Sequence, residues 1–395
     1  MDELPADPTV PGFYLRADYY EILAALRRDD PIREFAPGMR MISRYDDIRA
    51  ISRDPARFCS SMGALVNDPM RASEPPATAP SILHMDPPDH VGFRKLVNRE
   101  FTPRAIAKLE PRIRELARAV LERTPDSEPF DFVDLVAAPF PLMVIAELLG
   151  IPDGDRPDFR RWSDATIEAP DKPAAEAAAA TGELFRYLLE HIAAKKANPG
   201  DDVVSLLVGA ELDGRSLDRD ELLIFLLTLL VAGNETTRTL ISGGTLALFE
   251  HADQRADLTR DPALIPGAVE ECLRWVTPIQ AFARTVTADT EIGGVEVKKL
   301  DYLVLLYASG NRDEAAFGPT ANVFDIRRDV SPPHLAFGFG EHLCLGAALA
   351  RMETRILFEE MLPRHPDFAV VGEPQWVASS LVRGMQSMPL VWDAS

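Results

Sequence analysis

The feature that most constrains this chain is a glycine-punctuated loop that ends in a cysteine and runs directly into a helical pattern. It reads Phe337-Gly338-Phe339-Gly340-Glu341-His342-Leu343-Cys344-Leu345-Gly346. Glycines permit backbone angles that other residues resist, so the loop can fold tightly and direct N–H groups toward the sulfur. Unpaired N–H groups and the positive end of a helix favour a thiolate, so we expect a lowered pKa for the Cys344 thiol. The Phe337 ring could shield this thiolate from water, which would suit it to ligate iron.

A second motif lies within the longest helical pattern and reads Ala232-Gly233-Asn234-Glu235-Thr236-Thr237. Gly233 has no side chain, so another group can approach the backbone there. The Thr236 hydroxyl can bond to the Ala232 carbonyl, four residues back, and loosen the helix. Glu235 is a carboxylate in an apolar segment, which costs free energy unless it is paired or hydrogen-bonded. An acid beside an alcohol can move protons; a glycine kink with a solvated glutamate is the alternative.

Helical patterns dominate the chain, and strand patterns are short. We expect helices at 18–28, 45–52, 88–99, 103–123, 140–149, 174–195, 218–250, 262–276 and 345–362. Asp218 followed by Glu221 resembles a capping box at the start of the longest helix. Strands are expected at 39–43 and 302–307, with a hairpin at 285–297 that turns at Gly293-Gly294. No repeat or linker interrupts the pattern, which predicts a single, mainly α domain over residues 1–395 with a small β part.

Charge and cysteine content exclude several classes of protein. The net charge of −20 argues against non-specific binding to nucleic acid or to an anionic membrane. The three cysteines, Cys59, Cys272 and Cys344, are too sparse for a disulfide framework and suit a reducing cytoplasm. Residues 1–8 lack the basic start and apolar core of a signal peptide, and the apolar run 222–233 is too short to span a bilayer. We therefore expect a cytoplasmic protein that does not bind a membrane.

The cysteine loop resembles the haem-binding loop of the cytochrome P450 family at its fixed positions Phe337, Gly340, Cys344 and Gly346. The resemblance extends over nearly the whole chain, from residue 86 to residue 385. It implies a P450-like helical prism, mainly α, whose long central helix crosses a haem b. Cys344 is then the axial iron ligand, and no Cys-x-x-Cys-His run is present to attach the haem covalently. The resemblance also gives the haem further contacts at Ala232, Gly233, Phe337, Gly338 and Gly346.

The same resemblance assigns roles to three other groups of residues. Glu235 and Thr236 correspond to the acid–alcohol pair of the family and would be catalytic. The haem propionates need strong charged donors, and the family positions for these fall on His90, Arg94, Arg284 and His342; a surface cation is the alternative for each. Glu271 and Arg274 match a buried structural ion pair, although in isolation they could form an ordinary surface pair. An arginine just before an aromatic usually completes this group, but no arginine precedes Phe324, so the third partner is open.

A local excess of basic residues suggests a docking surface for an electron donor. From His90 to Arg123 there are nine Lys or Arg and four Glu, and Arg351 and Arg355 share one face of the helix after Cys344. Such a patch could steer an acidic partner, although most charge runs are merely solvated helix faces. The resemblance implies a ferredoxin as this partner, supplied with electrons by a reductase that uses NAD(P)H.

The expected function is therefore that of a haem-thiolate monooxygenase, which uses dioxygen and two electrons to hydroxylate a hydrophobic small molecule. The substrate is expected to contact the loop at 62–70, the helix after Trp162, Leu229, Ala232, the segment 279–282 and Met385. These are mostly apolar, so a steroid, terpenoid or lipid-like compound would suit them. Three alternatives remain: a polyketide-tailoring hydroxylase, a peroxygenase driven by hydrogen peroxide, and a non-catalytic haem gas sensor. The acid–alcohol pair argues against the last two, because a peroxygenase typically lacks it and a sensor does not need it.

Overall fold

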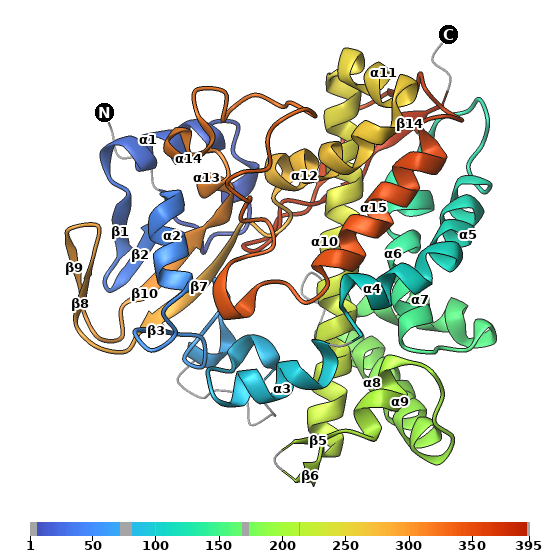
Figure 1. Ribbon diagram of the computed structural model, residues 1–395, viewed down its shortest axis with the longest axis horizontal. Coiled ribbons are helices and arrows are strands. Elements are labelled where there is room, and N and C mark those ends of the chain that lie inside the picture. Colours follow the sequence, from blue (N-terminus) through green and yellow to red (C-terminus); the bar gives the residue numbers. More distant parts are fainter. Residues whose placement is uncertain (1–5, 72–80, 99, 168–173, 213, 393–395) are drawn as a thin grey trace.

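The computed structural model describes residues 6–71, 81–98, 100–167, 174–212 and 214–392, and it is mainly helical, as predicted. Figure 1 shows the longest helix, α10 (Arg219–Glu250), running through the helical half of the molecule. Asp218 caps this helix, its side chain accepting from the N–H groups of Asp220 and Glu221, while the Glu221 carboxylate accepts from the Asp218 N–H. The predicted capping box is confirmed.

The other predicted helices are largely confirmed, and the structure has further helices at 156–167, 203–208, 252–260, 307–310 and 314–317 that were not predicted. Besides α10, the described helices are α1 (Tyr19–Asp29), α2 (Tyr45–Ser52), α3 (Asp89–Asn98), α4 (Pro103–Ile106), α5 (Glu110–Leu121), α6 (Pro139–Leu148), α7 (Arg156–Ile167), α8 (Ala174–Ala197), α9 (Val203–Val208), α11 (Ala252–Arg260), α12 (Ile265–Val276), α13 (Tyr307–Gly310), α14 (Glu314–Phe317) and α15 (Ala347–Met361). The helix predicted at 103–123 is divided into α4 and α5, because Pro111 can occupy a first turn but not a helix interior. Residue 99, the predicted end of the third helix, lies outside the described residues.

The helical half is built around α10, which packs against α6, α12 and α15. Its side chains contribute to a large apolar core shared with these helices and with α5. Within the described part of the chain, α10 is the one helix whose length and hydropathy would also suffice to cross a bilayer. The central helix of a protein core has the same composition. Length and hydropathy therefore do not distinguish a core helix from a membrane-spanning one.

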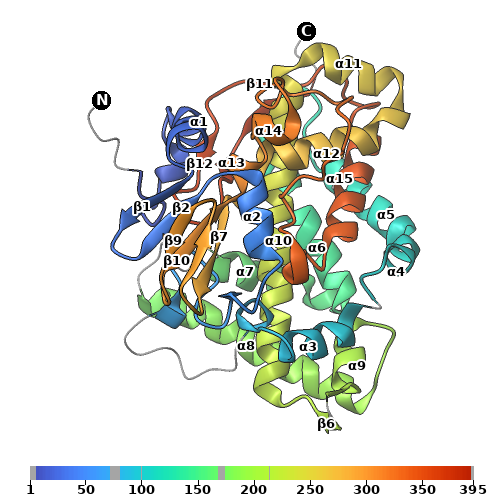
Figure 2. The same cartoon turned by 60° about the vertical axis from the view of Figure 1, so that its left-hand side comes forward.

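The β part is a mixed five-stranded sheet with the order β1-β2-β10-β7-β3 (Figure 2). Its strands are β1 (Ile32–Ala36), β2 (Met39–Ile42), β3 (Phe58–Cys59), β7 (Ala281–Val286) and β10 (Tyr302–Leu306). Both faces are covered: Leu303 and Leu305 belong to a core cluster with residues of α2, whereas Tyr302 and Val304 belong to one with residues of α1. The alternation along β10 follows the two-residue period of a strand.

The predicted hairpin at 285–297 is shorter in the structure. Only β8 (Thr290–Ile292) and β9 (Val295–Val297) form it, with Gly293 and Gly294 at the turn as predicted. Thr285 and Val286 instead belong to β7 and pair with β3. The short strands β4 (Phe130–Asp131), β5 (Glu211–Leu212), β6 (Arg215–Ser216), β11 (Ala369–Val370), β12 (Gln375–Trp376), β13 (Met385–Ser387) and β14 (Pro389–Val391) complete the described structure.

Candidate active site

The cysteine loop is a closed turn that leads into α15. Gly338 and Gly340 have φ angles of 68° and 76°, values that favour glycine, as the sequence predicted. The N–H of Cys344 donates to the carbonyl of Phe337 at 2.9 Å, which closes the loop. Gly346 precedes the first residue of α15, Ala347, so the cysteine stands just before the helix rather than within it.

The surroundings of the Cys344 thiol act on its pKa in two opposite directions. The Cys344 side chain is accessible, yet the protein around it is dense enough for burial to raise its pKa. The N–H of Gly346 and the charges of Arg94 and Arg351 act in the opposite direction and lower this pKa. The predicted lowering is therefore wrong in direction for the thiol by itself, since desolvation outweighs the loop N–H groups and the nearby cations.

The middle of α10 has the hydroxyl-to-carbonyl bond that the sequence predicted, although the helix continues through this turn without a break. The Thr236 hydroxyl donates to the Ala232 carbonyl at 2.5 Å. Val231 and Ala232 are exposed, although α10 is otherwise a core helix, so this turn lines an open space. Gly233 provides for helix packing, because a β-carbon there would lie 2.5 Å from the Ile145 side chain of α6. Ile145 thus approaches Gly233 on the side where a β-carbon would stand.

Glu235 is held by an arginine on its own helix. The Arg238 guanidinium lies 3.3 Å from the Glu235 carboxylate, and both side chains are largely buried. Arg238 also donates to the carbonyl of Met385 at 3.1 Å. Gly384 packs so closely that a β-carbon there would lie 3.1 Å from Glu235 Oε1. The acid of the predicted acid–alcohol pair is therefore fixed beneath β13, and the solvated alternative is wrong.

Four predicted cationic residues gather beside the cysteine loop. The rings of His90 (α3) and His342 lie 4.1 Å apart, and Arg94 donates to the carbonyls of Glu341 and Leu343. Burial, Arg94 and Arg284 lower the pKa of His90 to about 4, and burial, Arg284, His90 and Arg94 lower that of His342 to about 2. The positive charges of Arg94 and Arg284 thus oppose protonation of both histidines. A bound anion would offset these charges, so the cluster suits an anion.

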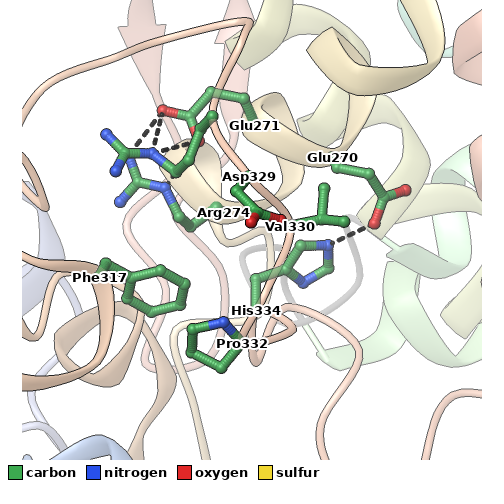
Figure 3. Close-up of a pocket in the computed structure, with 9 residues that line it drawn as sticks. Glu270, Glu271, Arg274, Phe317, Asp329, Val330, Pro332 and His334 are labelled. Atoms are coloured by element: carbon green, nitrogen blue, oxygen red, sulfur yellow. Dashed lines mark hydrogen bonds and ion pairs between the residues drawn. The ribbon is translucent and has the colours of Figure 1, made fainter.

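Glu271 and Arg274 form the predicted buried pair (Figure 3). The third partner is Arg328. Arg274 donates two bonds of 2.7 Å to the Glu271 carboxylate. Arg328 adds contacts of 3.1 and 3.3 Å to the same carboxylate. Arg274 also donates to the carbonyls of Asn311 and Ala321, each at 2.7 Å. Arg328 follows Phe324 by four residues, so a search for an arginine just before that ring could not find it.

Much of the predicted basic patch is neutralised by carboxylates from distant segments. Arg114 binds Glu110, Glu359 and Glu360, and Arg118 binds Glu360. On α15, Arg355 binds Glu110 and Glu359, whereas Arg351 forms bonds of 2.5 and 2.9 Å to Glu270. The excess of positive charge in the sequence does not become an equal excess on the surface.

Some of the predicted substrate-binding residues are brought together. The loop after Cys59 lies along β7, where the Ala283 N–H donates to the Ala64 carbonyl at 2.7 Å and Thr285 donates to the Met62 carbonyl at 3.1 Å. Ile279 forms a bridge to Val382, three residues before Met385. Trp162, which precedes the predicted helical segment, contacts α8: it donates to Glu183 at 2.5 Å and packs on Tyr187. Residues 168–173, in the segment after Trp162, lie outside the described part of the chain.

Comparisons with known proteins agree with this geometry. The model of the family "Cytochrome P450" matches residues 174–366. The vitamin D(3) 25-hydroxylase of Pseudonocardia autotrophica is 40% identical to this chain, over 93% of it and 92% of the relative. A steroid C26-monooxygenase of Mycobacterium tuberculosis is 36% identical, over 100% and 99%. The chain belongs to the cytochrome P450 family. The solved P450 EryK of S. erythraea, in an open form, superimposes with a TM-score of 0.87 at 35% identity, covering 98% of both chains.

Membership of the P450 family confirms the predicted fold and the monooxygenase class, and it implies a haem-thiolate iron cofactor. The residues present fit such a group. A haem brings two carboxylates, and the cluster of His90, Arg94, Arg284 and His342 offers two guanidinium groups and two imidazole rings to bind them, with Asp86 and Glu341 nearby. His90, Glu341 and His342 also place ligand atoms within 4.8 Å of one another. The two arginines make this site better suited to an anion than to a metal cation.

Proposed function

We propose that this P450 is a ferredoxin-dependent monooxygenase, a single cytoplasmic domain over residues 1–395 that hydroxylates a hydrophobic small molecule with dioxygen. The observation that carries the proposal is the arrangement of three groups. In this proposal an accessible thiol at Cys344, the His90, Arg94, Arg284 and His342 cluster beside its loop, and the turn of α10 with an acid and an alcohol belong to one site. Each group has a function only if a haem lies among them.

In this proposal the residues have distinct tasks. Cys344 ligates the iron, with Phe337, Gly338 and Gly346 forming the loop around it. His90, Arg94, Arg284 and His342 bind the propionates, and Ala232 and Gly233 face the haem from α10. When bound, a haem-thiolate supplies the activation of dioxygen that puts one oxygen atom into a C–H bond and releases the other as water.

Glu235 and Thr236 would deliver protons. The Thr236 hydroxyl donates to the Ala232 carbonyl, which fixes its orientation. Its oxygen can then accept a hydrogen bond from a proton donor. The Glu235 carboxylate is close by on the same helix, held by Arg238. A carboxylate that is fixed but partly desolvated is a suitable general acid when it carries a proton.

The electrons would come from a ferredoxin that is reduced by an NAD(P)H-dependent reductase. The side that carries α15 would be the docking face, because this helix begins at Ala347, shortly after Cys344. Arg351 is 41% exposed there, although Glu270 binds it. Because many arginines of this region are paired, we expect docking to depend less on ionic strength than the sequence suggested.

The substrate is proposed to be a steroid-like, terpenoid or lipid-like compound. Vitamin D(3) and steroids appear in the names of two relatives, and EryK has been solved with erythromycin B, which keeps a polyketide-derived substrate open. The ferric protein should be titrated with compounds of each class while the Soret band is recorded. A saturable blue shift with one class supports the proposal and identifies the preference. A purified protein without a haem spectrum would refute it.

The variant Thr236→Ala tests the proton pathway. We expect about 10- to 100-fold less product for each electron consumed, with the remainder recovered as hydrogen peroxide. Thr228→Ala is the matched control, because Thr228 makes the same bond to a carbonyl of α10, that of Ile224 at 2.7 Å. Unchanged product yield in Thr236→Ala would contradict the pathway. Full activity with peroxide, without ferredoxin, would identify a peroxygenase instead, and stable oxygen binding without product would identify a sensor.

A further inference from the structure

Glu270 lies beside the structural triad but belongs to a different group of contacts. It precedes Glu271 on α12, and Figure 3 shows the two carboxylates extending to different sides of a small pocket. Glu271 binds Arg274 and Arg328, as described above. Glu270 binds His334 and Arg351, which flank the cysteine loop in the sequence. Glu271 thus belongs to the structural triad, whereas its neighbour Glu270 contacts residues on either side of the cysteine loop.

The contacts of Glu270 meet at the ring of Phe337. Arg351 forms two bonds to Glu270, of 2.5 and 2.9 Å, and its guanidinium carbon lies 4.5 Å from the centre of the Phe337 ring. The His334 ring lies 5.6 Å from the same centre, and its Nε2 is 3.3 Å from Glu270. Phe337 in turn accepts the N–H of Cys344 at 2.9 Å. The Glu270 carboxylate therefore fixes the side chains of Arg351 and His334 against Phe337, the residue that closes the cysteine loop.

The charges of this group are balanced. Nδ1 of His334 accepts a hydrogen bond from the Ala336 N–H at 3.2 Å, so the neutral ring carries its proton on Nε2, which faces Glu270. Arg351 is always protonated. The negative charge of Glu270 therefore offsets the positive charge of Arg351. Without Glu270, the charge of Arg351, which contacts the Phe337 ring and acts on Cys344, would be uncompensated.

We propose that Glu270 is a positioning residue for the thiolate loop, which holds Arg351 and His334 against Phe337 and balances the Arg351 charge beside Cys344. The inference rests on the proposed role of Cys344 as the haem ligand. Reduction of the iron adds one negative charge to the site, and a nearby cation favours the reduced state. Glu270 thus keeps the reduction potential lower than Arg351 alone would set it.

The test is a charge cycle measured by spectroelectrochemical titration of the haem protein. Glu270→Gln should raise the reduction potential, with about a tenfold change in the reduction equilibrium, or about 59 mV for one electron. Arg351→Gln should lower it, because Glu270 then remains uncompensated. The double variant should return close to the original potential. Opposite signs that cancel in the double variant support the inference, since loss of packing alone would not produce them.

Glu110→Gln is the matched control, because Glu110 binds Arg355 at 2.9 Å, one turn further along α15. It should lower the unfolding temperature but leave the potential unchanged. Shifts of Glu270→Gln and Arg351→Gln in the same direction, or no larger than that of Glu110→Gln, would overturn the inference. If Glu270→Gln fails to bind haem, Arg351→Gln alone tests the inference: a lower reduction potential supports it, and a higher or unchanged potential overturns it. An original protein whose ferrous carbonyl spectrum lacks the thiolate band near 450 nm would instead refute Cys344 as the ligand.

Discussion

The carbonyl oxygen of Ser52 occupies the position where a β-carbon at Gly340 would stand. Ser52 is the last residue of α2, and Gly340 lies in the cysteine loop with a φ angle of 76°. The loop thus lies against the sheet-bearing half of the molecule, with no space between the two backbones. Its shape depends on a residue without a side chain for two separate reasons, the positive φ angle and this contact.

We expect Gly340→Ala to abolish most haem binding and to lower the free energy of unfolding by more than 2 kcal/mol, because the strain of a positive φ adds to a collision with backbone. Gly12→Ala is the control. Gly12 also has a positive φ angle, 92°, in the left-handed region, but open space where its β-carbon would be. That variant should cost only about 1–2 kcal/mol. Equal costs in urea denaturation would show that the contact with Ser52 has no effect.

The triad of Glu271, Arg274 and Arg328 gives a second prediction. Arg274→Leu should destabilise the protein by about 3–5 kcal/mol, since it leaves a buried carboxylate without its main partner. Arg328→Leu should cost about 1.5–3 kcal/mol, because Arg274 still binds Glu271. The neighbouring Arg327 binds only the partly exposed Asp257 at 2.9 Å, so Arg327→Leu should cost less than about 1 kcal/mol. Chemical denaturation of the three variants should reproduce this order.

Glu353 predicts an unusual dependence of stability on pH. It is 1% exposed on α15, and burial raises its pKa well above the usual value. The folded protein therefore keeps a proton that the unfolded chain loses above about pH 4. Stability should fall as the pH rises from there, by at most about 1.4 kcal/mol per pH unit. Glu353→Gln should remove this slope in thermal unfolding between pH 5 and 8.

Glu360, on the same helix, provides the contrast for this measurement. Its pKa is lowered by bonds to Arg118 and Arg114. The stability that it contributes is present above the pKa of the unfolded chain and is lost as the pH falls. Glu360→Gln should therefore lose most stability at neutral pH and least in acid. If the two variants respond to pH in the same direction, the assignment of Glu353 as a neutral group is wrong.

Arg238 gives a prediction about the acid of α10, because it contacts both Glu235 and the Met385 carbonyl. Arg238→Gln keeps a donor for the carbonyl but removes the charge, so it should mainly divert electrons to peroxide. Arg238→Leu removes both and should also weaken substrate binding, about tenfold in a spin-shift titration, by releasing β13. Identical behaviour of the two variants would show that the bond to Met385 is unimportant.

The parts of the structure that were predictable depend on neighbours in the sequence. The capping box at Asp218, the bond from Thr236 to Ala232 and the turn at Gly293-Gly294 each involve residues at most four positions apart. Short-range geometry fixes such features whatever the rest of the chain does.

The parts that were not predictable depend on distant partners. The pairing of Arg114 with Glu360 joins residues far apart in the sequence, and so does the contact of Arg328 with Glu271. The direction of the Cys344 pKa was missed for a related reason. The local N–H of Gly346 was anticipated, whereas the desolvation comes from the whole surrounding fold.

The pairing of β2 with β10 determines when this protein can complete its folding in a cell. Met39 lies beside Tyr302 in the sheet, about 260 residues later, which a ribosome needs about 13–52 s to synthesise. Throughout this time strand β2 lacks its partner β10. The surface of α2 that the cysteine loop will contact is uncovered for as long. Slow growth at low temperature and a good supply of chaperones should therefore increase the yield of intact protein more than any added haem precursor.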